Sequence, residues 1–111
     1  MEELKSIINE FIRVRDWEQY HAPKNLAMAL SVEAAEIVEI FQWNKAGDPL
    51  SPVEQEHLRQ EIGDVLVYLL ELAEKFEIDI VQAAKDKMIL NGKKYPIEKV
   101  KGKSDKYTAY K

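Results

Sequence analysis

The chain has 111 residues, of which 46% are hydrophobic and 32% are charged, a composition typical of one globular domain with a modest core. No apolar run reaches the roughly 20 residues of a membrane span, and the N-terminus lacks the pattern of a signal peptide. The absence of cysteine excludes disulfides and thiolate metal sites. We therefore expect a single domain over residues 1–111, located in the cytoplasm and without a membrane partner.

The formal net charge of −4 is unevenly distributed along the chain. Residues 92–111 contain seven Lys and two acidic residues, a charge of +5, which leaves −9 on residues 1–91. An acidic body of this kind argues against binding to duplex nucleic acid. The basic segment has the charge to meet phosphates or the acidic body of a neighbouring subunit.

The first half of the chain predicts two helices. Helical spacing over about residues 2–17 is given by Leu4, Ile7, Ile8, Phe11, Ile12 and Val14. Pro23 breaks that pattern, because the residue before a proline is disfavoured in the helical conformation. A second helix is expected over about residues 24–43, and the turn-forming residues 44–49 predict a loop.

The second half predicts two more helices and a tail. Ser51-Pro52-Val53-Glu54 combines a Ser cap, Pro at the first helical position and Glu at the capping-box position, so a helix should run from there to about residue 75 or 76. Asp79 can cap a fourth helix that ends near Asn91-Gly92. We predict an all-α, four-helix bundle-like body over about residues 1–91, followed by an extended or partly disordered basic tail over about residues 92–111.

Two carboxylate pairs, Glu33/Glu36 and Glu61/Asp64, stand out within this pattern. Each pair has i, i+3 spacing, which places both carboxylates on one side of a helix. Each also borders an apolar stripe, where a carboxylate costs several kcal/mol unless its charge is compensated. The predicted stripes are Leu26, Ala29, Leu30, Ile37 and Ile40 for the first pair, and Leu58, Ile62, Val65, Leu69, Leu72 and Phe76 for the second.

The two pairs would face one cleft if the second and third helices pack antiparallel, as their short loop favours. Ligands that are all oxygen suit Mg²⁺ or Mn²⁺, ions that commonly bind the phosphates of a substrate. The alternative is that Glu-rich helices carry such spacings by chance on a solvated face. The residues alone leave both interpretations open.

Aromatic and polar residues near the helix ends suggest a second kind of site. Trp17, Trp43 and Tyr68 would form a slot for a flat base, because indole rings stack well on nucleobases, with His21 close by. The alternative is ordinary core packing for each Trp and a local hydrogen bond for His21. The run Asn91-Gly92-Lys93-Lys94-Tyr95-Pro96 is compatible with a plain helix end or with lysines that reach a polyphosphate.

Parts of the sequence are also compatible with two other classes of protein, a di-iron bundle and a helical interaction module. Glu18/His21 and Glu54/His57 both have the ExxH spacing that di-iron bundles use. Their positions argue against iron, because His21 lies at a helix break and Glu54 already serves as a cap. A non-enzymatic helical interaction module would use the apolar stripes for assembly and the carboxylates for solubility.

The chain also resembles a known family, the MazG-like all-α nucleotide pyrophosphohydrolases, and is most similar to their dCTP pyrophosphatase branch. The resemblance extends from Phe11 to Thr108. It is carried by Arg15-Asp16-Trp17-Glu18-Gln19-Tyr20-His21, Pro23-Lys24-Asn25-Leu26, Glu33-Ala34-Ala35-Glu36, Phe41-Gln42-Trp43, Glu61-Ile62-Gly63-Asp64 with Tyr68, Lys87-Met88 with Asn91, Lys94-Tyr95-Pro96 and Lys106-Tyr107-Thr108.

The resemblance implies a homodimer or homotetramer that hydrolyses a (deoxy)nucleoside triphosphate to the monophosphate and pyrophosphate with Mg²⁺. It implies metal-binding and catalytic roles for Glu33, Glu36, Glu61 and Asp64. It implies substrate-binding roles for Trp17, His21, Trp43, Tyr68 and Asn91 around the nucleotide, and for Lys94 and Tyr95 near the phosphates. The loop after Trp43 is shorter than in the longer animal members, so the resemblance leaves the preferred base open.

Overall fold

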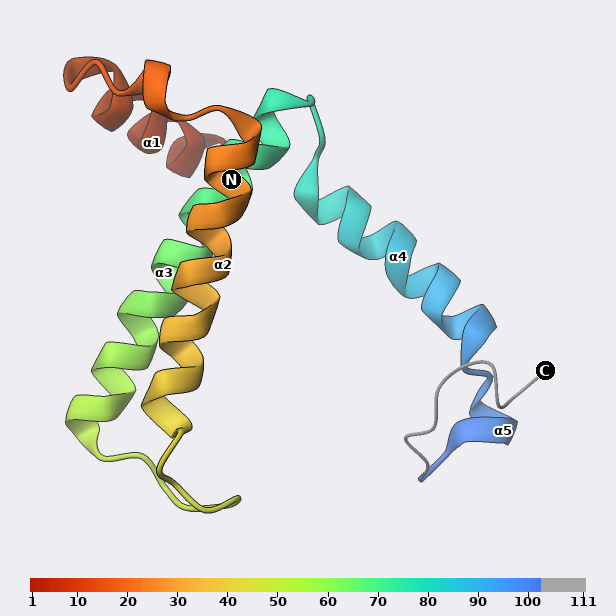
Figure 1. The fold of residues 1–111 in the computed structure, drawn as a ribbon. Coiled ribbons are helices and arrows are strands. Elements are labelled where there is room, and N and C mark those ends of the chain that lie inside the picture. Colours follow the sequence, from red (N-terminus) through yellow and green to blue (C-terminus); the bar gives the residue numbers. More distant parts are fainter. Residues whose placement is uncertain (103–111) are drawn as a thin grey trace. The chain divides into compact units, whose positions relative to one another are not determined.

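The computed structural model describes residues 1–102, and all of their regular structure is helical. This confirms the all-α prediction, while Lys106-Tyr107-Thr108 and the end of the basic tail lie outside the described residues. The elements in chain order are α1 (Glu2–Val14), the 3₁₀ helix η1 (Glu18–Tyr20), α2 (Pro23–Phe41), α3 (Pro52–Lys75), α4 (Ile80–Lys94) and α5 (Ile97–Val100) (Figure 1).

The chain divides into two compact units, Met1–Glu77 and Ile78–Lys111, and each is described here by itself. The expectation of a single domain stays a prediction. In the first unit α2 and α3 run antiparallel and side by side, and α3 also contacts α1 (Figure 1). In the part of the chain that the structure describes, no helix has both the length and the apolar composition needed to cross a membrane.

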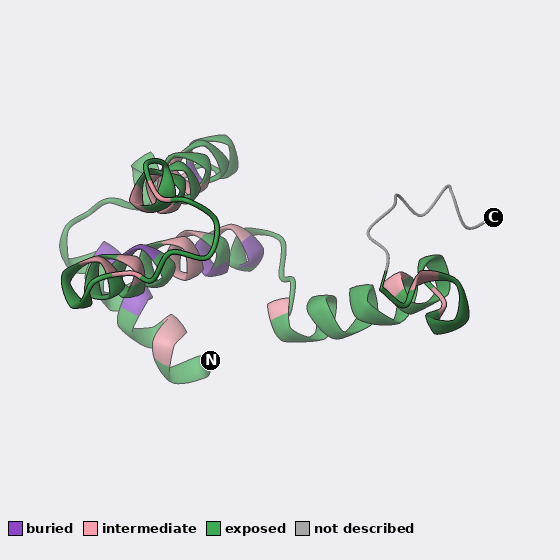
Figure 2. Ribbon diagram, turned by 90° about the horizontal axis from the view of Figure 1, so that it is seen from below, coloured by how far each residue is buried: buried purple, intermediate pink, exposed green. Residues whose placement is uncertain are grey.

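The apolar core of the first unit is small and lies where its three α-helices meet. Leu26 of α2 and Leu70 of α3 are 1% and 2% exposed. Ile8 and Ile12 of α1 are also buried. Among the described residues, all of the buried positions belong to these three helices (Figure 2). Two of the buried side chains, Glu61 and Glu71, are carboxylates.

Both predicted helix starts of the second half are confirmed. The Ser51 hydroxyl accepts a hydrogen bond from the Glu54 backbone N–H at 3.1 Å, and the Glu54 carboxylate accepts one from the Ser51 backbone N–H at 2.9 Å, which completes a capping box at α3. At α4, Asp79 Oδ1 accepts from the backbone N–H groups of Val81 and Gln82, both at 3.0 Å.

Two helix ends come earlier than their apolar spacing predicts. Helix α1 stops at Val14 rather than near Trp17, because the chain turns at Asp16, whose φ of +52° lies in the left-handed region. Helix α2 stops at Phe41, and the Asn44 N–H closes a turn onto the Phe41 carbonyl at 2.9 Å. Trp43 therefore lies in this turn and not on the helix.

The C-terminal segment is more helical than predicted. Helix α4 continues through Gly92 to Lys94, and α5 replaces the extended chain that was expected after Pro96. The Pro96 carbonyl accepts hydrogen bonds from the N–H groups of Lys99 and Val100, at 3.0 and 3.1 Å. Pro96 can start this helix because its missing N–H has no partner to lose at a helix N-terminus.

The predicted apolar stripe of α3 is wrong in part. Ile62, Leu69 and Phe76 are 53%, 39% and 60% exposed, although the spacing placed them with buried residues. Helix α3 is apolar on more than one side, so periodicity could not determine which side faces α1 and α2. The exposed side chains of Ile62 and Leu69 on α3 are available for contacts outside this chain.

Candidate functional site

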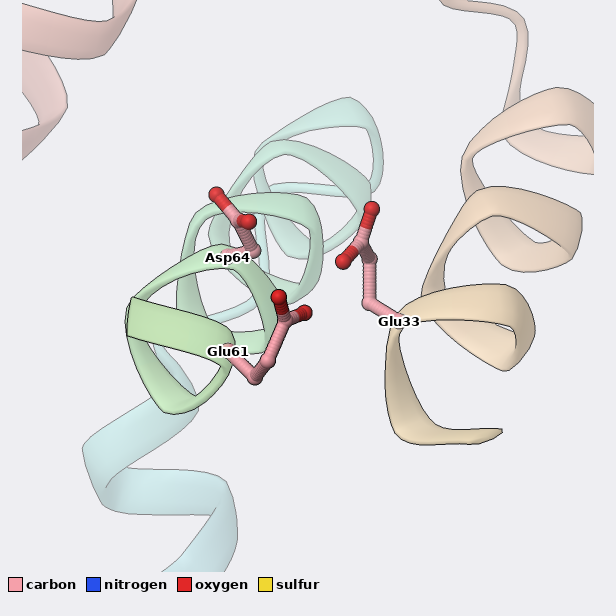
Figure 3. A group of neighbouring side chains, drawn as sticks. All are labelled: Glu33, Glu61 and Asp64. Atoms are coloured by element: carbon pink, nitrogen blue, oxygen red, sulfur yellow. The ribbon is translucent and has the colours of Figure 1, made fainter. Parts of the chain in front are cut away.

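Three carboxylates converge between α2 and α3. One oxygen from each of Glu33, Glu61 and Asp64 lies within 4.8 Å of the others, and Figure 3 shows Glu33 across from the neighbouring Glu61 and Asp64. The i, i+3 spacing puts Glu61 and Asp64 on one side of α3, and the antiparallel packing brings Glu33 of α2 opposite them. The antiparallel arrangement predicted from the short loop thus brings together three of the four predicted carboxylates.

Two of these carboxylates each have one buried oxygen without a hydrogen-bond partner among the described residues. Glu61 is 8% exposed and Glu33 is half-buried, whereas Asp64 is exposed. The Oε2 atoms of Glu33 and Glu61 are buried, and neither has a hydrogen-bond partner among the described residues. A buried oxygen in this state is normally satisfied by a proton or a cation.

Protonation is one way in which the cluster can reduce its negative charge. Burial, more than any other factor, raises the pKa of Glu33 to about 7, and the nearby carboxyl of Glu61 and the charges of Glu36 and Asp64 act in the same direction. One potential cation lies beside the cluster, since His57 Nε2 is 3.5 Å from Glu61 Oε1. The His57 side chain is 57% exposed.

These residues fit a hard divalent cation. The donors are carboxylate oxygens, which Mg²⁺ and Mn²⁺ prefer, and two of them lack any other partner. One oxygen of each carboxylate lies within 4.8 Å of the others, so the three could hold one such ion after small side-chain movements. Glu36 is half-buried and close enough to affect the pKa of Glu33, but it is not one of the three converging carboxylates.

A cavity of about 340 Å³ lies between α1 and α3, and Asp64 belongs to both the cavity and the cluster. Its described lining is Leu4, Ile7, Ile8, Phe11, Ile12, Trp17, His21, Asp64, Val67, Tyr68 and Glu71. Three predicted substrate-binding residues, Trp17, His21 and Tyr68, thus share one cavity. The ring of Trp17 packs edge-on to that of Phe11, with 5.8 Å between ring centroids. The Arg15 guanidinium lies 3.6 Å over the Phe11 ring.

Glu71 is a residue of this site that the sequence analysis missed. It is 7% exposed, and its Oε2 lies 2.9 Å from His21 Nδ1. A signal for it exists in the sequence, because Glu71 follows Asp64 by seven residues and so returns to the same side of α3. Burial raises the pKa of Tyr68, and the charges of Glu33, Glu71 and Asp64 raise it further. The ionisation of Tyr68 is therefore affected both by the carboxylate cluster and by Glu71.

Trp43, the remaining predicted substrate-binding residue of the first unit, does not line this cavity. Trp43 is 88% exposed in the turn after α2. Asn91, Lys94 and Tyr95 belong to the second unit, which is described separately from the first. Their roles stay predictions.

The structure does not bring the two ExxH pairs together as metal ligands. Glu54 is engaged in the capping box of α3. The group of converging carboxylates in the described part of the chain contains no histidine.

The sequence is similar to known proteins. Residues 28–109 match the model of the MazG-like family. The chain is 40% identical to human dCTP pyrophosphatase 1 and 39% identical to that of Bos taurus, in each case over 112 residues and 97% of this chain, and it spans 66% of the length of each of these relatives.

A solved structure is also similar to this chain. It is a pyrophosphatase from Archaeoglobus fulgidus with 44% sequence identity and a TM-score of 0.73, and the match covers 86% of this chain and 92% of that one. The family match extends over most of the sequence and includes all four predicted carboxylates. The chain belongs to the MazG-like family.

Proposed function

We propose that this protein is a Mg²⁺-dependent nucleoside triphosphate pyrophosphohydrolase that releases pyrophosphate and a nucleoside monophosphate. The observation that carries the proposal is that Asp64 joins a carboxylate cluster to a cavity lined by Trp17, His21 and Tyr68. A nucleoside triphosphate needs both parts, a place for a flat base and a place for charged phosphates. The names of the similar proteins, dCTP pyrophosphatase 1 and a pyrophosphatase, support the same class of reaction.

The cluster would hold the metal through Glu33, Glu61 and Asp64, with Glu36 beside them. When bound, Mg²⁺ supplies positive charge for the phosphate oxygens and lowers the pKa of water. In the reaction a water oxygen forms a bond to the α-phosphorus, the bond from that phosphorus to the bridging oxygen breaks, and pyrophosphate leaves with that oxygen. We assign Glu36 to orient the water or accept its proton, because its carboxylate is not one of the three that converge.

The nucleoside would occupy the cavity between α1 and α3. Trp17 supplies an aromatic face, and Tyr68 and His21 supply polar groups beside it. We propose a cytosine nucleotide, canonical or modified, as the preferred substrate, which the name of the human and Bos taurus relatives supports. Removal of unwanted nucleotides from the cytoplasmic pool is the role that we assign to this activity.

We propose that the active form is a homodimer or homotetramer. Large apolar side chains remain exposed on this chain, among them Met28, Val32 and Val38 of α2, which are 58%, 57% and 65% exposed. Exposed apolar surface of this extent is typical of subunit contacts. In such an assembly a neighbouring copy would contribute Trp43, Asn91, Lys94 or Tyr95 to the site.

Pyrophosphate release from a panel of canonical and modified (deoxy)nucleoside triphosphates tests the proposal, with Mg²⁺ and with a chelator. We expect release that requires Mg²⁺ and is fastest with a cytosine nucleotide. Glu61→Gln and Asp64→Asn should each reduce turnover about a hundredfold or more, because each removes a charge that holds the metal. Both variants should keep the helical content of the wild type by circular dichroism.

Glu39→Gln is the matched control, because Glu39 is an exposed carboxylate of α2 only one turn beyond Glu36. It should retain wild-type turnover. Wild-type rates in Glu61→Gln or Asp64→Asn would remove the metal site. No release from any triphosphate would favour the helical interaction module instead.

A further inference from the structure

His21 and Glu71 form a close pair of titratable side chains, and both side chains are largely buried. Glu71 Oε2 lies 2.9 Å from His21 Nδ1, and the two side chains are 7% and 18% exposed. Both atoms are buried, and neither has a well-directed hydrogen bond to any described residue, the other member of the pair included. Burial raises the pKa of Glu71, and the charge and hydrogen bonding of His21 partly offset this effect.

The pair lies where two cavities meet. His21 and Glu71 line the cavity that contains Trp17 and Tyr68, and they also line a second cavity of about 320 Å³. The remaining described residues around the second cavity are Asn9, Ile12, Glu18, Glu74 and Lys75. The contact between His21 and Glu71 therefore lies next to the proposed nucleoside site.

The 2.9 Å distance between two buried atoms favours a proton shared between them. A buried carboxylate oxygen without a donor is strongly disfavoured, and His21 Nδ1 is the donor within ion-pair distance of it. A histidine ring with its proton on Nδ1 has a fixed tautomer, and a hydrogen bond from this N–H to the carboxylate would also fix the rotation of the ring. Nε2 is then the ring nitrogen that remains for a ligand.

We propose that Glu71 is a positioning residue that keeps the proton of His21 on Nδ1 and leaves Nε2 to contact the substrate. That the substrate is a nucleotide rests on the proposed function, but the effect of Glu71 on the ring does not. Glu71 acts here through His21 and does not itself need to touch the substrate.

Nitrogen-15 NMR of the imidazole rings tests the effect on His21 without any assay of activity. The chain has two histidines, so the loss of one set of signals in His57→Gln assigns the other set to His21. At a pH where the ring is neutral, we expect wild-type His21 to have a protonated Nδ1 and an unprotonated Nε2. A wild-type ring with the proton on Nε2 would overturn the proposal, whether or not any variant folds.

Two variants of Glu71 separate positioning from simple packing. Glu71→Leu removes both oxygens and should let the proton move to Nε2, whereas Glu71→Gln keeps one acceptor oxygen and should retain much of the wild-type pattern. Glu74→Leu is the control, because Glu74 lines the second cavity and accepts a hydrogen bond from Asn9 at 3.2 Å, whereas the ion pair of His21 is with Glu71. It should leave the His21 signals unchanged.

Steady-state kinetics then connect the ring to the substrate. We expect Glu71→Leu to raise KM for the triphosphate about tenfold with kcat within about twofold, and Glu71→Gln to raise KM less. His21→Ala in the Glu71→Leu background should add little further loss. Equal losses in both Glu71 variants with unchanged ring signals would overturn the proposal. A wild type that shows the expected ring pattern but no turnover would refute the proposed function and leave the role of Glu71 supported.

Discussion

Glu33→Gln should stabilise the metal-free protein at high pH. Glu33 has a pKa of about 7 in the folded chain against a usual value of 4.5, so the folded state holds its proton more tightly than the unfolded state does. Stability should therefore fall as pH rises from about 4.5 to about 7, where the folded group also loses its proton. Glutamine stays neutral throughout and avoids this loss.

The magnitude follows from the size of the pKa difference. Each pKa unit corresponds to about 1.4 kcal/mol, so the difference between 4.5 and about 7 corresponds to about 3.5 kcal/mol. Glu33 is only partly buried, and solvent screening reduces this figure. We expect Glu33→Gln to be more stable than the wild type by about 1–2 kcal/mol at pH 8 and by much less at pH 5.

Urea unfolding at pH 5 and pH 8, with a chelator and at one protein concentration, measures this difference. Glu39→Gln serves as control and should match the wild type at both values of pH, because Glu39 is exposed on the same helix. Added Mg²⁺ should narrow or cancel the difference in stability at pH 8. It should stabilise the wild type by about 1.4 kcal/mol at ten times its Kd, and it should stabilise Glu33→Gln much less. A variant no more stable than the wild type at pH 8 without metal would refute the reasoning.

Two further substitutions test other parts of the first unit. Ser51→Ala removes the acceptor for the Glu54 N–H and should lower the free energy of unfolding by about 1 kcal/mol, measured by chemical denaturation, with no change in turnover. An unchanged stability would mean that the capping box contributes little to this fold. His57→Ala removes an exposed ring 3.5 Å from Glu61 and should change kcat by no more than about threefold, whereas a protein that uses His57 as an iron ligand would lose its metal.

Local interactions made the helices and their starts predictable. The hydroxyl of Ser51 and the carboxylate of Glu54 are three residues apart, so the sequence itself brings them together once a helix begins. Asp79 acts in the same way at α4. The i, i+3 spacing likewise placed Glu61 and Asp64 on one side of α3 before any packing was considered.

Other features depend on which helices meet, and the sequence did not reveal them. Because α3 is apolar on several sides, its spacing could not show that Ile62 and Phe76 stay exposed in the single chain. The stop of α1 depends on a left-handed residue at Asp16, which the apolar spacing through Val14 does not signal. The extended tail was predicted from composition, which does not exclude a short helix such as α5.

The sequence by itself determined the helical class, the helix caps and the four candidate carboxylates, because these follow from interactions within a few residues. Only the tertiary structure showed that Glu33 meets Glu61 and Asp64, and that Glu71 is buried against His21, fifty residues away along the chain. Such pairings depend on how α2 and α3 lie against each other. Burial then changes what the same side chains do, since a carboxylate that is ordinary in water holds its proton to about pH 7 at Glu33.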